Sequence, residues 1–350
     1  MSSPAKQTEL TQLWYTRCPL PAASGIAQRF RWLHQAFAAQ GIKLDTIRTS
    51  PDRAVRDSHF THAQPGLFRE GGPVPPLWAR ALGRETALVG ITRIDEAQAV
   101  LVRSDSALDT LEDLHGKRLA LPRHATQYAD HARAQTLHRF TEVLARAGLS
   151  PRDVAFIDID EGEYEIREPP VAVNQTQFPV LDALLEGRVD AVYASGARIG
   201  RFAAGHGLRA LREDPADAAT AIRYRPGAPR PITVNRDLAI DHPRIVARYL
   251  AVLQQTAAWA AANPDRALSV ITAEIGGTEA ANREGYGPNL HRQLDVKLSA
   301  DYLSALEGHK NFLRDNGFLT GDFDFQDWIV SEPLALAEQI VASEDLALAV

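Results

Sequence analysis

The chain contains a single cysteine, Cys18, among its 350 residues. A lone cysteine forms no intrachain disulfide, so a disulfide scaffold and a zinc site built from cysteines are both excluded. Lysine is also scarce, and the formal net charge is −6 with a pI near 6.0. The chain therefore has no basic field for nucleic acid or an anionic membrane, and we expect neither as a partner.

Long hydrophobic runs are missing too. No segment approaches the ~18 consecutive apolar residues of a membrane span. The N-terminal sequence MSSPAKQTEL has no apolar stretch of the kind found in signal peptides. From this pattern we expect a cytoplasmic protein. Hydrophobic residues make up 45% of the chain and charged residues 23%, which is ordinary for a globular protein with a sizeable core.

Strand and helix patterns alternate over about the first 240 residues, after which helical patterns dominate. A strand is predicted around Leu13 and Tyr15, followed by a helix that Ser24 would cap and by a second strand over 42–47. This helix would present one apolar face, formed by Ile26, Phe30, Leu33 and Phe37.

Further along the chain, residues 51–85 are rich in proline, glycine and arginine and predict a long loop with short helices. Strands are expected over 86–103 and 231–238, and an acidic, proline-rich loop over 160–172.

This alternation predicts an α/β fold with a parallel-type sheet and two lobes around a cleft. We expect the first lobe to comprise residues 1–103 and 225–350, and the second lobe residues 104–224. The C-terminal helices would pack back on the first lobe.

Cys18 is the first candidate for chemistry. It follows the first predicted strand and precedes the first predicted helix, where a helix N-terminus would favour the thiolate form. A cysteine in such a loop can be a nucleophile, but it can also be a buried side chain that acts as a small hydrophobic residue. The residues alone leave both readings open.

The second candidate is the segment SHFTHAQPGLFREGGPVPP, residues 58–76. Arg69 offers a planar fork for an oxyanion, and Gly71 and Gly72 allow backbone N–H groups to approach such an anion closely. His59 can carry a proton near neutral pH. His59 and His62 also have a metal-like spacing, but no nearby acidic or cysteine ligand completes a metal site. The alternative is a surface loop with solvated charges.

These motifs resemble those of a known family, the aromatic sulfinate desulfinases. The resemblance rests on YTRCPLP at 15–21, HFTHAQP at 59–65, REGGPVPPL at 69–77 and, less specifically, LEGRVDAVY at 185–193. It runs from about residue 12 to Trp328. It implies a two-lobed, periplasmic-binding-protein-like (type II) fold and a cofactor-free hydrolase that cleaves an aryl C–S bond and releases sulfite.

By resemblance, Cys18 would be the essential thiol and His59 its proton partner. Arg69 and the backbone N–H of Gly72, with Gly71 beside it, would hold the sulfinate. Gln64, Phe60 and, from the second lobe, Phe178 would line the pocket. The ligand would be a small organosulfur anion, with no metal and no further cofactor, and the enzyme would act as a monomer.

The sequence departs from the family at several positions near these residues. It has His62-Ala63 where the family has Tyr-Asp, Glu70 where the family has an apolar residue, and ASGARIG at 194–200 where the family has tryptophans. These differences predict a more polar or narrower range of substrates. The alternative function is a non-catalytic solute-binding protein of a transporter, because the same fold also serves that role.

Overall fold

The computed structural model describes residues 10–164, 166, 178–214, 216 and 223–343. Its strands form one sheet in the first lobe and two smaller sheets in the second lobe. The first-lobe strands are β1 (Gln12–Arg17), β2 (Lys43–Thr46), β3 (Leu67–Glu70), β4 (Thr86–Thr92) and β11 (Arg230–Asn235). The second-lobe strands are β5 (Asp95–Arg103), β6 (Arg118–Ala125), β7 (Ala155–Glu163), β8 (Val192–Ser195), β9 (Leu208–Ala210) and β10 (Tyr224–Pro226).

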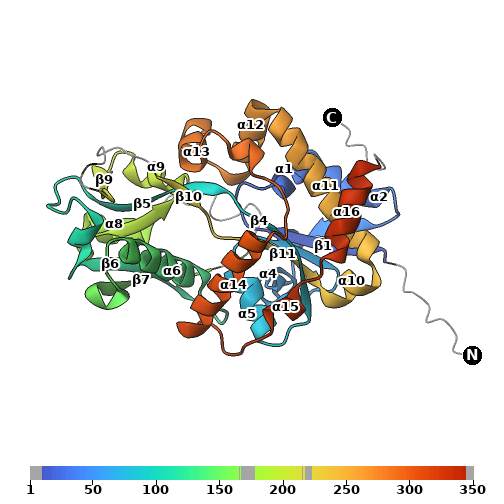
Figure 1. Cartoon of the computed structure of the whole chain (residues 1–350), viewed down its shortest axis with the longest axis horizontal. Coiled ribbons are helices and arrows are strands. Elements are labelled where there is room, and N and C mark those ends of the chain that lie inside the picture. The colour runs from blue at the N-terminus through green and yellow to red at the C-terminus, as the bar shows by residue number, and fades with distance from the viewer. Residues whose placement is uncertain (1–9, 165, 167–177, 215, 217–222, 344–350) are drawn as a thin grey trace, which may run out of the picture.

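The helices surround these sheets, and those of the second lobe lie to the left in Figure 1. The first lobe begins with α1 (Ala23–Arg29), α2 (Trp32–Ala38), α3 (Arg53–Arg56), α4 (Ser58–Thr61) and α5 (Val74–Ala81). The second lobe carries α6 (His131–Arg146), α8 (Pro179–Leu185) and α9 (Arg198–Ala203). After β11 come α10 (Arg236–Asp241), α11 (Pro243–Ala262), α12 (Pro264–Ile275), α13 (Glu279–Tyr286), α14 (Ala300–Asp315), α15 (Phe325–Trp328) and α16 (Glu332–Ala342). Short 3-10 helices are η1 (Ile47–Thr49), η2 (Leu111–Leu114), η3 (Pro151–Asp153) and η4 (Leu290–Arg292).

The first-lobe sheet has the order β2-β1-β3-β11-β4. Strands β1, β2 and β3 are parallel, whereas β11 runs antiparallel to both of its neighbours. The predicted α/β class is therefore confirmed, and the parallel arrangement holds for the part of the sheet that carries Cys18. The C-terminal helix α16 packs against α11 on this lobe, as predicted.

The segment 51–85 contains more than the expected loop and short helices. Helices α3, α4 and α5 are there, but so is β3, which pairs with β1 in the middle of the sheet. This strand has only four residues, LFRE, and two of them are charged. Four residues are too few to show the alternation of apolar and polar side chains that predicts a strand. The segment is a strand because it pairs with its neighbours in the sheet.

The first predicted helix is in fact two helices. The chain breaks between α1 and α2, where Arg31 adopts a left-handed conformation with φ 60°. Ser24 does not cap α1: the N-cap is Ala22, and Ser24 is buried inside the first turn. The helix also starts five positions after Cys18, so the thiol lies in the preceding loop and not at the helix N-terminus.

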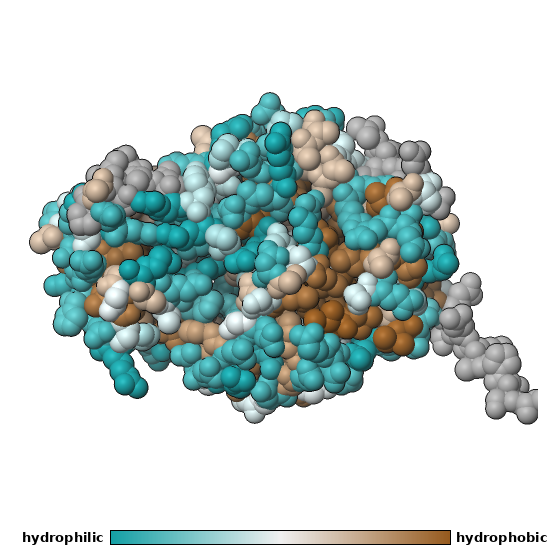
Figure 2. Space-filling view, viewed as in Figure 1, coloured by the Kyte–Doolittle hydropathy of each residue, from teal (hydrophilic) through white to brown (hydrophobic). Residues whose placement is uncertain are grey.

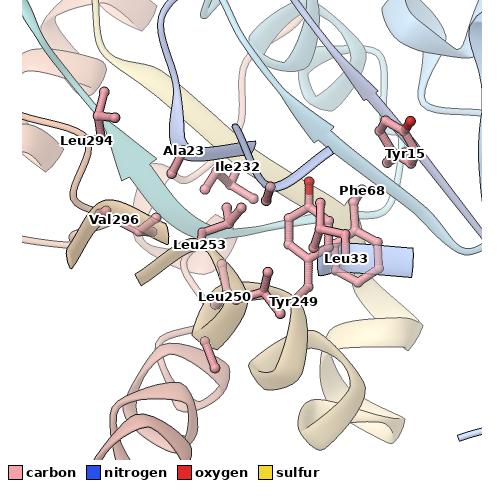
Figure 3. Packing of buried hydrophobic residues seen from close by; sticks show 14 of the residues in the cluster. Tyr15, Ala23, Leu33, Phe68, Ile232, Tyr249, Leu250, Leu253, Leu294 and Val296 are labelled. Carbon is pink, nitrogen blue, oxygen red and sulfur yellow. The ribbon is translucent and has the colours of Figure 1, made fainter. Parts of the chain in front are cut away.

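The first-lobe core lies between the sheet and the helices packed against it. Figure 3 shows Tyr249 of α11 beside Phe68 of β3, and their rings stack with centroids 4.1 Å apart. All seven residues of β4 are buried, which is typical of a strand that is covered on both faces. On the outer surface, Figure 2 shows hydrophobic residues gathered over the first lobe, whereas the visible face of the second lobe is mostly hydrophilic.

The boundary expected between the lobes, after residue 103, falls at the end of β5. Strand β5, 95–103, pairs with β8, β9 and β10 of the second lobe, although the sequence-based boundary places it in the first. Within the described residues, no helix is long and apolar enough to cross a bilayer.

Trp328 allows a test of this packing. Its side chain is fully buried, and its indole N–H donates a hydrogen bond to Thr86 Oγ1 at 3.0 Å. Replacing it with phenylalanine leaves the Thr86 hydroxyl unpaired and opens a small cavity. We expect Trp328→Phe to lower the free energy of unfolding by about 1–3 kcal/mol, measured by urea titration. Leu82→Ala, at a side chain that is 53% exposed, is the control and should change it by less than about 0.5 kcal/mol. An unchanged unfolding midpoint in Trp328→Phe would contradict this account.

Candidate active site

The candidate site lies at the carboxyl ends of three parallel strands. Cys18 directly follows β1, Arg48 lies in the turn after β2, and Gly71 directly follows β3. The backbone N–H of Cys18 donates to the carbonyl of Glu70 at 3.1 Å, which continues the pairing of β1 with β3 and fixes the loop that carries the thiol. Carboxyl ends of strands in such sheets are where ligands bind.

Cys18 forms a chain of contacts with His59 and Thr16. The Sγ atom of Cys18 lies 3.7 Å from His59 Nε2, and His59 Nδ1 lies 2.9 Å from Thr16 Oγ1. Thr16 precedes Cys18 by two residues on β1, whereas His59 is brought in by α4. The imidazole is thus held between a hydroxyl and a thiol, in the order orienting group, base and nucleophile.

The surroundings of the His59 imidazole favour its neutral form. Burial lowers the pKa of His59 well below its usual value, and the charges of Arg69 and Arg48 lower it further. A neutral imidazole can accept the proton of a thiol or pass it on, which a permanently charged one cannot. The site therefore pairs a thiol with a proton acceptor.

Arg69 is a buried cation with one nitrogen left over. Its side chain is 1% exposed, Nε donates to the carbonyl of His59 at 2.8 Å, and one terminal nitrogen donates to the carbonyl of Gly72 at 3.1 Å. The other terminal nitrogen, Nη1, is buried and has no partner among the described residues. Burial lowers the pKa of Arg69 to about 10, so the group keeps its charge near neutrality.

The buried Arg69 guanidinium is suited to bind an anion. A buried charge is costly unless it is paired and hydrogen-bonded, and within the described residues Arg69 donates only to carbonyl oxygens. An oxyanion at Nη1 would supply both the charge and the acceptor.

Gly71, the first of the two glycines after β3, is required by close packing. A Cβ on Gly71 would lie 2.3 Å from Cys18 Sγ, and the residue has a φ of 148°, a conformation that favours glycine. A Cβ on Gly72 would lie 2.7 Å from Nε2 of Gln135, a residue of α6. Gly71 thus makes room for the thiol, whereas Gly72 lies against the flexible end of one side chain of the other lobe.

The ring of Phe60 lies beside His59, 5.3 Å between centroids, and second-lobe aromatic groups surround it. Tyr128 stacks on Phe60 at 4.9 Å, and Tyr164 contacts it edge-on at 5.8 Å. The Tyr128 hydroxyl donates to Asp57 Oδ2 at 2.8 Å. The second lobe therefore closes on α4, the helix that carries His59.

Phe178 and Gln64, the two other side chains expected to line the pocket, have these surroundings in the structure. The ring of Phe178 packs against Phe202 at 5.1 Å, in the core of the second lobe. Gln64 is half-buried, its amide nitrogen lies 3.5 Å from the carbonyl of Pro65, and its backbone N–H donates to Ser58 Oγ. The part of both side chains in the site stays a prediction.

His59 and His62, despite their metal-like spacing, have different partners. His59 contacts Cys18 and Thr16, whereas His62 Nε2 lies 3.0 Å from Thr233 Oγ1. In the part of the chain that the structure describes, no three metal-ligating side chains come together. A separate surface cavity of about 330 Å³, lined in part by Arg93, Asp95 and Lys297, shares no lining residue with the Cys18 site.

Sequence reasoning missed Thr16, Arg48 and Tyr164. Thr16 has a recoverable signal, because it lies two positions before Cys18, the spacing at which residues of an extended chain point to the same side. Tyr164 belongs to the acidic loop expected at 160–172, of which residues 165 and 167–172 lie outside the described residues. Its place beside Phe60 depends on how the lobes meet, which no local pattern encodes.

The fold and the site together define a two-lobed α/β protein with a thiol, an imidazole and a buried guanidinium at the carboxyl ends of its strands. A family model described as NMT1/THI5 like matches residues 76–267, and the chain belongs to this NMT1/THI5-like family.

Named relatives and solved structures agree with the resemblance seen in the sequence. The 2'-hydroxybiphenyl-2-sulfinate desulfinase of Rhodococcus erythropolis is 29% identical, over 91% of this chain and 92% of the relative. The crystal structure of a cysteine-to-serine mutant of DszB with biphenyl-2-sulfinic acid is 25% identical, with a TM-score of 0.69 over 95% of this chain and 99% of that one. The predicted kinship with sulfinate desulfinases is confirmed.

The predicted periplasmic-binding-protein-like fold is confirmed as well. A sulfonate-binding protein SsuA from Methylobacillus flagellatus has a TM-score of 0.70 over 96% of each chain, at 15% identity. At that identity the likeness concerns the fold alone.

The buried histidines make stability depend on pH. Burial lowers the pKa of His62 to about 3, so the unfolded chain binds a proton at this residue below about pH 6.5 while the folded chain does not. Its contribution to stability is complete above pH 6.5 and is lost as the pH falls, by up to about 1.4 kcal/mol per pH unit. We expect His62→Gln, which can still hydrogen-bond Thr233, to flatten the pH dependence of the free energy of unfolding between about pH 6 and 4. His115→Gln, at an exposed histidine, is the control and should leave the slope unchanged. Equal slopes in wild type and His62→Gln would refute this.

Proposed function

We propose that the protein is a cofactor-independent sulfinate desulfinase, a hydrolase that cleaves the C–S bond of an aromatic sulfinate and releases sulfite. One observation carries the proposal: the unpartnered, buried Nη1 of Arg69 belongs to the residue that also holds the backbone of His59, the partner of Cys18. A sulfinate spreads one negative charge over two oxygens, which suits a guanidinium. The names of the relatives support the same chemistry.

The reaction needs only water. An aryl sulfinate anion and one water molecule give the arene and hydrogen sulfite, so no oxidant or reductant is consumed. The leaving aryl carbon must gain a proton, and the sulfur must gain an oxygen. Cys18 and His59 are the groups at hand for both tasks.

Two routes use these groups. In one, the Cys18 thiolate attacks sulfur, the aryl group departs with a proton, and water then releases sulfite from the thiol adduct. In the other, Cys18 delivers its proton to the ring carbon that bears the sulfur, and water adds to the released sulfur dioxide. His59 serves the first route as a base and the second as a proton relay.

The proposal extends to the setting of the enzyme. It takes a small organosulfur anion, acts as a monomer and works in the cytoplasm. The Gly72 N–H would assist Arg69 in holding the anion, since Gly72 already lies against that guanidinium through its carbonyl.

The first test replaces the only thiol. We expect Cys18→Ser to reduce sulfite release by on the order of 10³-fold or more, because neither route proceeds without a thiol. Binding of biphenyl-2-sulfinate, measured by titration calorimetry, should persist, since the sulfur atom is not part of the anion cradle. Circular dichroism checks the fold. Normal turnover in the variant would contradict the mechanism. If the wild type binds the sulfinate but shows no turnover, the protein is better explained as a solute-binding protein.

The second test replaces the guanidinium with an ammonium group. Lysine cannot donate to His59 O, Gly72 O and a ligand at the same time, so Arg69→Lys should weaken sulfinate binding by about 1–3 kcal/mol. Arg80→Lys is a matched control, because Arg80 lies on α5 of the same lobe and pairs with Glu85. The sulfinate affinity of Arg80→Lys should equal that of the wild type. If Arg69→Lys also binds sulfinate as tightly as the wild type, Arg69 lies outside the site.

A further inference from the structure

We propose that Tyr164, a residue of the second lobe, is a further ligand of the anion: its hydroxyl donates a hydrogen bond to an oxygen of the sulfinate that Arg69 holds, so that the substrate bridges the two lobes. This inference rests on the proposed function and adds to it the residue by which the second lobe recognises the substrate.

Tyr164 occupies the position where the topology brings the second lobe to the site. It directly follows β7, which is parallel to β6, so it lies at a carboxyl end of strands just as Cys18 does in the first lobe. Figure 1 shows β6, β7 and α6 together in the second lobe. The ring contacts of Tyr164 show where its side chain lies.

Three rings hold the side chain in place. The ring of Tyr164 lies edge-on against His131 at 4.5 Å, against Phe60 at 5.8 Å and against His124 at 5.8 Å. Phe60 is the neighbour of His59 on α4. The phenol is therefore fixed by packing beside the helix that carries the proposed base, and its hydroxyl is not needed for that packing.

The hydroxyl is available for a ligand. Among the described residues the Tyr164 oxygen makes no hydrogen bond, in contrast to that of Tyr128, which donates to Asp57. The ring lies against Phe60, the neighbour of His59, and the phenol is close enough to Cys18, Arg48 and Arg69 for their charges to act on it. Burial raises the pKa of Tyr164 to about 12, with a further contribution from Cys18, so the hydroxyl keeps its proton and acts as a donor.

The two unused donors complement one ligand. Nη1 of Arg69 comes from the first lobe and the hydroxyl of Tyr164 from the second, and a sulfinate presents two oxygens that accept hydrogen bonds. The lobes already meet around this point through the contact of Tyr128 with Asp57 and the ion pair of Arg53 with Glu163. An anion held from both sides is thereby shielded from water, which strengthens each hydrogen bond.

The test compares two second-lobe tyrosines that both contact Phe60. In the Cys18→Ser background, which prevents turnover, Tyr164→Phe should weaken binding of benzenesulfinate about 10- to 100-fold in a calorimetric titration, as expected for a hydrogen bond to a charged group. Tyr128→Phe removes a hydroxyl that bonds Asp57 and should weaken binding less than about threefold. Thermal melts establish that both variants are folded.

A second readout separates ligation from a structural effect. With Cys18 restored, Tyr164→Phe should lower kcat/KM for sulfite release while the shape of its pH profile between pH 6 and 9 stays that of the wild type, because the phenol does not titrate in this range. A lost limb of the profile would overturn the assignment of Tyr164 as a fixed donor.

The outcomes distinguish this inference from the proposed function. If the wild type releases sulfite and Tyr164→Phe binds benzenesulfinate as tightly as its parent, the Tyr164 inference is overturned and the desulfinase remains. Equal losses in Tyr164→Phe and Tyr128→Phe would also overturn it, since they would reflect the contact between the lobes. If the wild type neither binds nor cleaves any sulfinate, both proposals are rejected.

Discussion

The buried guanidinium of Arg69 is the constraint on which the site depends. Two of its nitrogens donate hydrogen bonds to the carbonyls of His59 and Gly72. These bonds link helix α4 to the loop after β3. The third, Nη1, is enclosed without a partner. Because the group is charged and almost fully buried, the fold tolerates it best when an anion is present. The same side chain thus offers a hydrogen-bond donor to an anion and holds the backbone of His59, the partner of Cys18, and after burial itself its charge also lowers the pKa of His59.

The rest of the fold positions this group and its neighbours. The parallel strands β1 and β3 bring Cys18 and Gly71 to one edge of the sheet, where only a glycine leaves room for the thiol. The second lobe then covers the site by packing Tyr128 and Tyr164 on Phe60. A thiol and an imidazole therefore lie where the two lobes meet, and this pair makes the chain a candidate enzyme.

Short sequence motifs were sufficient to predict the part of the site that lies in the first lobe. The motif blocks around Cys18, His59 and Arg69 indicated an anion site, and the structure places these three residues together. Strand β3 was missed because four residues with two charges carry no clear periodicity, although its pairing with β1 creates the site. Tyr164 was missed because its position follows from contact between lobes. Phe178, expected in the pocket from the resemblance alone, packs against Phe202 of the second lobe, and its part in the site stays a prediction.

The account is tested most directly by measuring the products formed from aryl sulfinates. Purified protein is incubated with benzenesulfinate and biphenyl-2-sulfinate, without added metal or cofactor, and sulfite and the corresponding arene are quantified together. The account predicts that both products appear in a one-to-one ratio. Tight binding of the sulfinates with neither product formed would contradict it.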